Sequence, residues 1–431
     1  MTKKTGSLTT ALMHFGQVSK VLEFKESQLS EPIDLSDDQL SEITQIGRDL
    51  ASKKSYYAAD EDDPEDSEAN KSQIIRFRRN QEDKYQIRVH NAIGVVSLTD
   101  LTLHVHPKIP LNHFAHLAHR AYEAPRSHKN PIEVANLEAF RDVLAQWCIS
   151  SIESLMIGGL ISEYRDKTEN LSVVRGRAEP RLTTTNYLRG RLAANCTFDE
   201  LDIDNSLNRI LKAALNTIDR SKIQIDPEVR RRARNLQRRM SNVGTLVHHD
   251  LKVKLERHSQ HYFVALDLSR RVIGSLGIDI HSGATGGESF LIPTPGLVEA
   301  AILSILKKNL APLPVNKHRK TMNGNSNFSI NPDIIFENGT VTGDVKYKIS
   351  ESNWVRSDVA QAAMFASGYD AKAAVILSFA EDKDLIELKM DLGQLQLHRI
   401  TWQASEHVKP IDAEEEFVAR MRAFVLPFQL A

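Results

Sequence analysis

The sequence predicts an α/β protein, α+β in overall arrangement, with a small β-rich region first, a helical region next and a mixed sheet flanked by helices last. Three observations predict this order. Apolar residues alternate along residues 85–106, they recur at helical spacing over 137–151 and 207–215, and an Asn-Gly pair at 338–339 separates two strand-like runs. The 431 residues are sufficient for about two to four domains.

Composition excludes several classes of protein. Hydrophobic residues make up 41% and charged residues 26%, which is typical of soluble globular chains and not of disordered, fibrous or membrane-embedded ones. Cys148 and Cys196 are too few for a disulfide framework or a cysteine-rich zinc site. The N-terminus lacks the apolar run of a secretory signal, and no run reaches the about 18 apolar residues of a membrane-spanning helix. We therefore expect a cytoplasmic protein without membrane contact.

The formal net charge of -1 conceals an asymmetry. Residues 1–70 hold 7 Lys/Arg against 15 Asp/Glu, whereas the other 361 residues hold 48 against 41. Seven of the twelve residues 59–70 are acidic, which predicts an exposed linker, with an acidic docking tail as the alternative. The small positive excess of the remainder predicts weak affinity for DNA by this chain alone.

The first predicted region spans residues 1–130 and is expected to dock a partner. Ser36 is suited to cap a helix within residues 1–58. Three strand-like runs follow at 85–89, 92–98 and 101–106, and Pro107 ends the third. They predict a small antiparallel sheet or barrel.

The second predicted region spans residues 131–250 and is helical. One helix is expected to start near Pro131, a second to run over 205–220, and a basic third over 227–240. The expected buried face of the first comprises Leu137, Phe140, Leu144, Trp147, Cys148 and Ser151, and that of the second comprises Leu207, Ile210, Leu211, Ala214 and Leu215.

The third predicted region spans residues 251–431 and carries the mixed sheet. A helix over 295–309 is expected, with Thr294 as its cap and Pro295 at its first position. A strand pair at 328–347, a helix at 357–367 and a strand at 373–378 follow.

The strand pair predicts a site. Asn338-Gly339 favours a two-residue type I′ hairpin, because both positions of that turn need positive φ. Counting back from the turn places Asp333 directly opposite Asp344, with Cβ atoms about 4.5–5.5 Å apart. Such facing carboxylates are unfavourable unless a divalent cation lies between them. Lys346 is expected on the same face.

This arrangement resembles the PD-(D/E)xK nucleases, on the residues Pro332-Asp333 and Asp344-Val345-Lys346. The resemblance implies a restriction-endonuclease-like sheet and phosphodiester hydrolysis, with Mg²⁺ held by Asp333 and Asp344 and with Lys346 serving the attacking water. Two further residues match positions of that fold. Glu299 matches the acidic residue on its first helix, where it would assist with the metal, and Gln361 matches its Gln-xxx-Tyr element, although Phe365 replaces the tyrosine. Each could equally be a helix-surface residue.

Other segments resemble the McrC family, in matching order from about residue 85 to about residue 380. They are Asn91–Val96, Leu103–Ile109, Gly158–Tyr164, Val174–Arg177 and Cys196–Leu215, and the signature residues within the last two are Arg175, Arg177, Asp199, Glu200 and Asn208. These residues have two interpretations: contact with the partner, or a structural role in which the arginines brace a tight glycine turn against Asp199 or Glu200. Asp202 and Asp204 are candidate caps for the helix beginning near Asn205.

The McrC resemblance implies a role. McrC proteins are the endonuclease subunit of a modification-dependent (type IV) restriction system. Their partner is McrB, an AAA+ GTPase ring that recognises double-stranded DNA carrying methylated cytosine and whose GTP hydrolysis McrC stimulates. This sequence has no G-x-x-x-x-G-K-[ST] motif, so we expect no nucleotide on this chain and GTP on the partner. The alternatives are a non-catalytic assembly subunit with a vestigial nuclease domain, and a nuclease that acts without a motor.

Two further sets of residues carry weaker hypotheses. The candidates for contact with DNA phosphates are Arg230, Arg231 and Arg234 on the basic helix and Lys317, Arg319 and Lys320 before the hairpin, although the arginines could instead pair with acids of the chain. His104, His106, His113, His116 and His119 cluster in the sequence. Without a cysteine or a nearby acid pair to complete a zinc site, we interpret them as surface histidines.

Overall fold

The structure is a computed structural model that describes residues 11–14, 17–52, 74–122, 136–221, 225–276, 290–322, 328–350, 353–381 and 387–428. It confirms the mixed α/β class. The chain forms two compact units, one from residues 1–143 together with 274–431 and the other from residues 144–273. The acidic run 59–70 and Pro131 lie outside the described residues. The predicted boundaries at 130 and 250 stay predictions.

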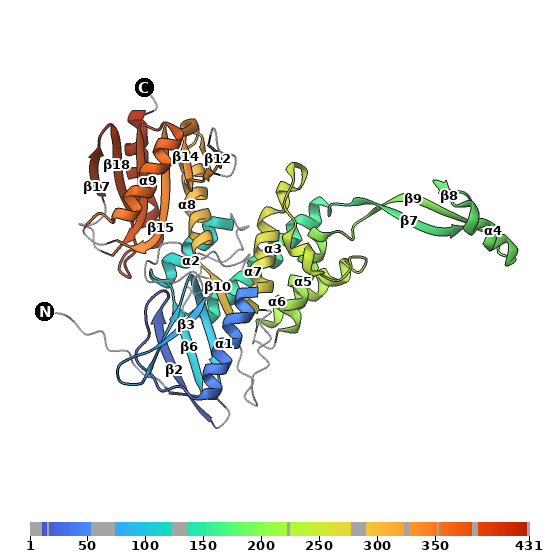
Figure 1. The fold of residues 1–431 in the computed structure, drawn as a ribbon, viewed down its shortest axis with the longest axis horizontal. Helices are drawn as coiled ribbons and strands as arrows, with labels where there is room; N and C mark the ends of the chain where they lie inside the picture. The colour runs from blue at the N-terminus through green and yellow to red at the C-terminus, as the bar shows by residue number, and fades with distance from the viewer. Residues whose placement is uncertain are drawn as a thin grey trace. The chain divides into compact units, whose positions relative to one another are not determined.

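A five-stranded sheet occupies the N-terminal part of the first unit (Figure 1). Its order is β1 (Ala11–His14), β2 (Gln17–Lys25), β6 (Leu101–His106), β5 (Ala92–Leu98) and β10 (Phe290–Pro293). Strands β5 and β6 are antiparallel as predicted, but β2 runs parallel to β6, so the sheet is mixed. The sequence prediction missed this because β2 lies far from β6 in the chain. Strand β4 (Tyr85–Val89) instead pairs with β3 (Ile75–Arg79) in a separate ribbon.

Helix α1 (Asp37–Ser52) covers one face of this sheet and contributes Ile43 to its core. Ser36 caps the helix as predicted: the backbone N–H of Gln39 donates to Ser36 Oγ at 3.2 Å, and the Gln39 side chain accepts from the Ser36 N–H at 3.0 Å. Alternation along β6 places Leu103 and Val105 in the same core, so His104 and His106 project from the opposite face.

A six-stranded sheet occupies the C-terminal part of the first unit. Its order is β11 (Val315–Asn316), β14 (Ile334–Phe336), β15 (Val341–Ile349), β16 (Ala373–Ala380), β18 (Leu395–Gln403) and β17 (Glu387–Leu392). Strands β15, β16 and β18 are parallel, and the others join antiparallel. Between β11 and β14 in the sequence, β12 (Lys320–Thr321) and β13 (Ser329–Ile330) pair as a small antiparallel ribbon.

Helices cover both faces of this sheet. On one face, helix α9 (Arg356–Tyr369) packs its alanines on β16. The other face carries α2 (Leu111–Tyr122), α8 (Pro295–Asn309) and α10 (Pro410–Val425), and the turn η6 (Leu426–Phe428) follows α10. Lys346 reaches α9, whereas the next residue, Tyr347, contacts Phe114 of α2. Adjacent strand residues point to opposite faces, so the two helix layers enclose β15.

A buried carboxyl group joins the two sheets. Glu26, at the end of β2, has no exposed surface, and Thr294 Oγ1 donates to its Oε2 at 2.6 Å. Thr294 therefore precedes α8 as predicted but does not cap it through its side chain, because the hydroxyl is directed to Glu26. Tyr347 of β15 completes the contact, and burial raises the pKa of Glu26 above its ordinary value against the opposing effect of Lys108.

The second unit contains the predicted helices and a feature that the sequence did not predict. The helices are α3 (Leu137–Gly158), α5 (Ser206–Arg220), α6 (Pro227–Arg239) and α7 (Phe263–Leu276), of which α3 and α7 cross the unit boundary, with the turns η2 (His248–Lys252) and η3 (Arg257–Tyr262). The predicted inward faces of α3 and α5 are buried. The addition is an arm built from β7 (Glu163–Leu171), β8 (Arg177–Ala178), α4 (Pro180–Leu188) and β9 (Ala194–Asp202) (Figure 1).

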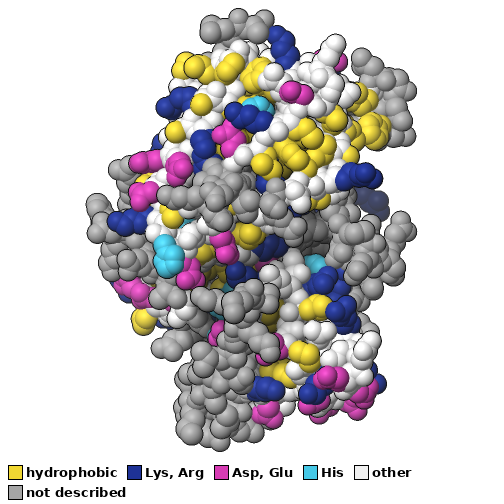
Figure 2. All heavy atoms as spheres, turned by 90° about the vertical axis from the view of Figure 1, so that its left-hand side faces the viewer, with side chains coloured by type: hydrophobic (Ala, Val, Ile, Leu, Met, Phe, Trp, Pro, Cys, Tyr) yellow, Lys and Arg dark blue, Asp and Glu magenta, His cyan; other side chains and the backbone are white. Residues whose placement is uncertain are grey.

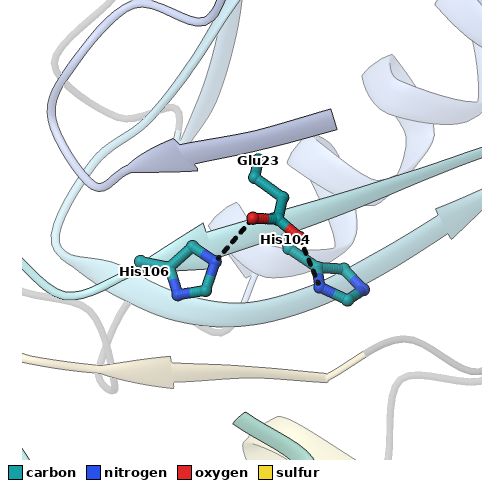
Figure 3. A group of neighbouring side chains, drawn as sticks. All are labelled: Glu23, His104 and His106. Carbon is teal, nitrogen blue, oxygen red and sulfur yellow. Dashed lines mark ion pairs between the residues drawn. The ribbon is translucent and has the colours of Figure 1, made fainter. Parts of the chain in front are cut away.

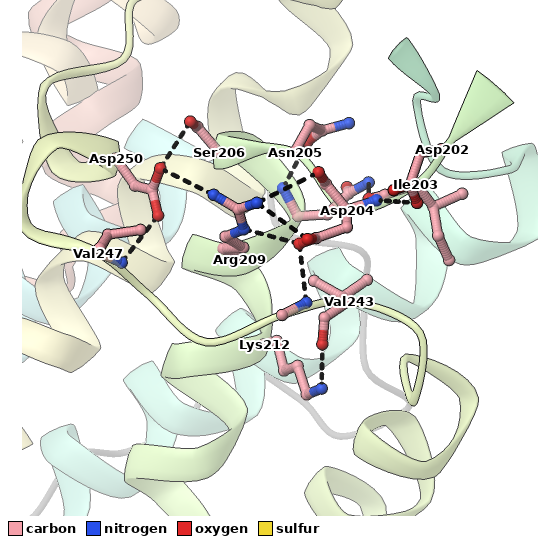
Figure 4. Close-up of polar contacts among 12 residues, drawn as sticks. Asp202, Ile203, Asp204, Asn205, Ser206, Arg209, Lys212, Val243, Val247 and Asp250 are labelled. Carbon is pink, nitrogen blue, oxygen red and sulfur yellow. Dashed lines mark hydrogen bonds and ion pairs between the residues drawn. The ribbon is translucent and has the colours of Figure 1, made fainter. Parts of the chain in front are cut away.

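A network of charges braces the base of this arm (Figure 4). Asp204 binds the Arg209 guanidinium at 2.6 Å and accepts the Gly244 N–H at 2.8 Å, and Arg209 also lies 3.6 Å from the fully buried Asp250. Arg209 holds the pKa of Asp204 well below its usual range. Asp204 is therefore not a helix cap. Asn205 caps α5, since its side chain accepts the Asn208 N–H at 3.0 Å.

Candidate active site

The hairpin has the predicted register. Asn338 and Gly339 both have positive φ, 58° and 111°, and Thr340 N donates to Glu337 O at 3.3 Å across the turn. The ladder pairs Ile334 with Gly343, one step from the predicted pair Asp333 and Asp344. A side chain at 339 would meet the Tyr369 ring at 2.9 Å, so this position requires glycine for its space as well as for its φ.

Asp344 lies in the middle of β15 and is 3% exposed. Burial raises the pKa of its carboxyl to about 7, with a further rise from Asp333, while Lys346 opposes the shift. Lys346 Nζ lies 3.2 Å from Asp344 Oδ2, but no described donor gives this buried oxygen an aligned hydrogen bond. A buried carboxylate oxygen whose described contact is the Lys346 ammonium is suited to bind a divalent cation as well, because oxygen is the ligand that such ions prefer.

Asp333 immediately precedes β14 and is held by both of its oxygens. Oδ2 accepts the backbone N–H of Val345 at 2.9 Å, which fixes the carboxylate against β15. Oδ1 lies 3.0 Å from Lys317 Nζ, and the same ammonium lies 2.9 Å from Glu299 Oε2. Lys317 thus bridges Asp333 and Glu299, so a cationic group already lies between two of the predicted metal ligands.

The shifted pKa values follow from this cluster. Burial raises the pKa of Glu299, the charge of Asp333 adds to the rise, and Lys317 opposes it. Burial alone would lower the pKa of Lys317, but the charges of Asp333 and Glu299 outweigh it and raise that pKa. The carboxylates therefore favour a positive charge at this place, as oxygen ligands of Mg²⁺ would.

Helix α9 orients Lys346. The Lys346 Nζ donates to Gln361 Oε1 of this helix, so these two predicted site residues are in contact. One rung further along β15, Lys348 Nζ lies 2.7 Å from Asp358 of the same helix. Phe365 is 7% exposed and fills the helix–sheet interface where the related motif has a tyrosine. The structure thus brings Asp344, Lys346 and Gln361 together on the α9 face, and Asp333, Lys317 and Glu299 beside them.

The basic residues before the hairpin are engaged within the chain. Lys317 binds the two carboxylates, which sequence reasoning did not foresee, since nothing in its local pattern separates it from its neighbours. Arg319 Nε donates to Ser329 Oγ at 2.6 Å, and Lys320 Nζ lies 5.1 Å from the centre of the Tyr369 ring. Their proposed contacts with DNA stay predictions.

The arginines of the basic helix α6 pair with groups of the same chain, which was the alternative to their predicted contact with DNA. Arg230 donates to the carbonyl oxygens of Asp219 and Ser221, Arg231 binds Glu228 at 2.7 Å, and Arg234 binds Asp219 at 2.6 Å. Arg230 and Arg234 thus join α6 to the end of α5, whereas Arg231 pairs within α6. A contact with DNA would compete with those ion pairs.

The signature residues lie in the arm and at its base. Arg175 stacks 4.1 Å from the centre of the Phe198 ring and lies 3.9 Å from Glu200, with Gly176 at φ +67° between Arg175 and Arg177, which pairs with Thr197. Asp199 faces Asp166 across the β7–β9 ladder, and that neighbour raises the pKa of Asp199.

Asn208 has a structural role at the base of the arm. It is buried, and its amide donates to the carbonyl oxygens of Ile161 and Ile203.

The histidines do not behave as one surface set. His113 is fully buried, where its Nδ1 accepts from Trp402 Nε1 at 3.1 Å, so the interpretation as a surface residue is wrong for it. His116 Nε2 lies 2.6 Å from Glu414. His104 and His106 are half-buried and both lie near Glu23, an acid that the sequence reasoning did not connect with them.

Residues 87–379 match a family model described as McrBC 5-methylcytosine restriction system component. Among solved structures, a chain from a Thermococcus gammatolerans assembly of McrB AAA+ hexamers with bound McrC matches at 15% identity and a TM-score of 0.54, covering 93% of this chain and 100% of that chain. A chain of the T. gammatolerans McrBC complex matches at 16% identity and a TM-score of 0.42, covering 68% and 88%. No curated protein matches. The first structure shares the fold. Among the described helices, none has the length and apolar character to cross a membrane.

Proposed function

Since this chain belongs to the family of McrBC 5-methylcytosine restriction system components, we propose that it is the McrC-like DNA endonuclease subunit of such a system. It hydrolyses phosphodiester bonds at a Mg²⁺ site of the PD-(D/E)xK type. The observation that supports the proposal is the hairpin register, in which Ile334 pairs with Gly343 and the next residues outward are Asp333 and Asp344, with Lys346 Nζ 3.2 Å from Asp344. Burial of a carboxylate costs free energy, so a buried aspartate at position 344 is not expected of an ordinary solvated strand and favours a functional role.

The residues of the site divide the work. Asp333 and Asp344 would hold Mg²⁺, and Glu299, which contacts Lys317, would assist. The ion, when bound, neutralises charge on the scissile phosphate and lowers the pKa of a bound water. Lys346 stabilises the negative charge that develops on the attacked phosphate, and Gln361 holds its ammonium in place. The N–H of Val345 keeps Asp333 directed at Asp344.

A McrB-like AAA+ GTPase ring is the proposed partner, and its GTP hydrolysis is stimulated on docking. The related assembly has McrC bound to McrB hexamers, which supports this partner. The substrate is double-stranded DNA with modified cytosine, engaged chiefly through the partner, in the cytoplasm. Among the described side chains on the face that Figure 2 shows, basic and acidic groups are interspersed, and such a mixed surface favours weak DNA binding by this chain alone.

The test is cleavage of labelled methylated DNA by the chain with its partner ring, GTP and Mg²⁺. We expect Asp344→Asn to lower the cleavage rate by about 100-fold or more while assembly with the ring persists, since the change removes a metal ligand and not a docking surface. Asp391→Asn, an exposed carboxylate on the edge strand β17 of the same sheet, serves as the matched control and should cleave normally.

Other outcomes would point to the alternatives. No cleavage by the unaltered chain with ring, GTP and Mg²⁺ would favour a vestigial nuclease domain. Efficient cleavage by the chain alone would favour a nuclease that needs no motor. Unchanged cleavage by Asp344→Asn would contradict the assignment of the site.

A further inference from the structure

A second group of potential metal ligands lies on the N-terminal sheet, far along the chain from the hairpin (Figure 3). His104 and His106 are two residues apart on β6, so both project from the same face of the sheet. Glu23 on the parallel neighbour β2 is in register with His104. The pairing of β2 with β6 therefore places a carboxylate between two imidazole rings.

The distances are close to those of a coordination shell. Glu23 Oε1 lies 3.9 Å from His104 Nδ1, and Glu23 Oε2 lies 3.8 Å from His106 Nε2, both too long for hydrogen bonds. The three donor atoms all lie within 4.8 Å of one another. Ligand atoms at about 2.0–2.2 Å from a tetrahedral ion are roughly 3.3–3.5 Å apart, so small side-chain rotations would close the set.

The surroundings permit that adjustment. The side chains of His104, His106 and Glu23 are 19%, 39% and 48% exposed, so they are anchored on the sheet but accessible to solvent. Lys25, the next residue on this face of β2, could repel a cation. Its ammonium lies 3.8 Å from Glu381, which offsets that repulsion.

We propose that Glu23, His104 and His106 form a binding site for a first-row divalent cation, with Zn²⁺ as the favoured ion. Two imidazoles and one carboxylate suit Zn²⁺, and three protein ligands leave a position for water or a further ligand. This donor set differs from the carboxylates of the hairpin, which suit Mg²⁺. The site is independent of the proposed nuclease activity.

Binding would fasten β2 to β6. The site exists only when the two strands are paired, so a metal that binds there stabilises the folded chain by its binding free energy. Strand β2 leads directly to Glu26, whose carboxyl contacts Thr294. The site thus secures the strand that connects the N-terminal sheet with the nuclease sheet.

The experiment is titration of ZnCl₂ into the full chain, free of any histidine tag, by isothermal calorimetry. Asp344→Asn serves as the background, so that the hairpin carboxylates contribute less to binding. We expect one tight equivalent of zinc, a loss of at least about tenfold in its affinity with Glu23→Gln, and a rise in Tm with zinc that Glu23→Gln lacks. Co²⁺ in place of zinc should give the strong visible absorption of tetrahedral nitrogen and oxygen ligands.

The control is His258→Gln, which alters another exposed histidine with a glutamate nearby, Glu256 at 3.6 Å; among the described residues this pair belongs to no group of three closely spaced ligand atoms. It should leave the tight equivalent intact. Glu23→Gln keeps the shape of an exposed side chain, and an unchanged metal-free Tm would establish that it folds. The proposal would be overturned if Glu23→Gln bound zinc with equal affinity. It would also be overturned if the chain that retains Glu23 bound no tight equivalent of zinc.

Discussion

At the residue scale, Lys317 is the most informative member of the candidate active site. Its ammonium contacts Glu299 and Asp333 at 2.9 and 3.0 Å, in the place where a metal ion would contact the same carboxylates. A lysine in this position keeps the cluster close to neutral while no metal is bound. It also competes with the metal, because both depend on the same oxygen atoms.

We therefore expect Lys317→Ala to raise the affinity of the isolated chain for Mn²⁺ by about three- to tenfold, through loss of the competing charge. Calorimetric titration with MnCl₂ measures this directly. Lys307→Ala, an exposed lysine near the end of α8, is the control and should not change the affinity. Unchanged or weaker Mn²⁺ binding by Lys317→Ala would show that the lysine supports the carboxylates and does not compete for them.

At the element scale, the arm of the second unit combines polar strands with exposed apolar residues. Strand β7 alternates charges and buries none of its side chains. The large apolar side chains exposed on the arm are Tyr164, Val173, Val174, Leu182, Tyr187, Leu188, Leu192 and Leu201. Since soluble proteins rarely leave such groups in water without reason, we propose the arm as a docking surface for the ring, in addition to the predicted docking role of residues 1–130.

Leu188 and Leu192 are 81% and 82% exposed. Replacing both with aspartate should weaken association with the partner ring by about tenfold or more. The Tm of the chain should not change, because neither side chain is buried. Size-exclusion chromatography of the mixture gives the measurement. Ile157→Asp changes an equally exposed apolar residue at the end of α3, outside the arm, and should retain binding. Normal co-elution of the Leu188 and Leu192 variant would exclude the tip of the arm as the docking surface.

At the scale of the whole molecule, the buried Glu26 links the five-stranded N-terminal sheet to the six-stranded C-terminal sheet. Its carboxyl contacts Thr294, Lys108 and Tyr347, which belong to three separate segments of the chain. The pKa of Glu26 is raised from 4.5 by burial, so the folded state favours its protonated form. The contribution of this group to the free energy of unfolding is fully present below the pKa of the group in the unfolded chain. It is lost as the pH rises through the higher pKa of the group in the folded chain.

The Tm of the unaltered chain should therefore fall as pH rises above about 4.5, and Glu26→Gln should remove this part of the dependence, since an amide does not ionise. Thermal unfolding across pH 5 to 8 tests the prediction, with Glu31→Gln, an exposed glutamate just after β2, as the control. A constant difference in Tm between Glu26→Gln and the unaltered chain at every pH would mean that Glu26 stays ionised in the fold.

The sequence by itself determined the features that depend on local chemistry. The Asn338-Gly339 turn requires positive φ at both positions, so it set the register of the hairpin, in which Ile334 pairs with Gly343 beside Asp333 and Asp344. Helical spacing predicted α3 and α5, and Ser36 predicted the start of α1. Each of these signals lies within a few residues of the structure that it predicts.

Only the tertiary structure decided the rest. The bridge of Lys317 between Glu299 and Asp333, the direction of Thr294 toward Glu26, and the meeting of Glu23 with His104 all join segments that are distant in sequence. The arm was missed because its long strand β7 carries polar side chains on both faces and so lacks the alternation that marks a half-buried strand. Such pairings arise from the packing of whole sheets, and no local spacing specifies them.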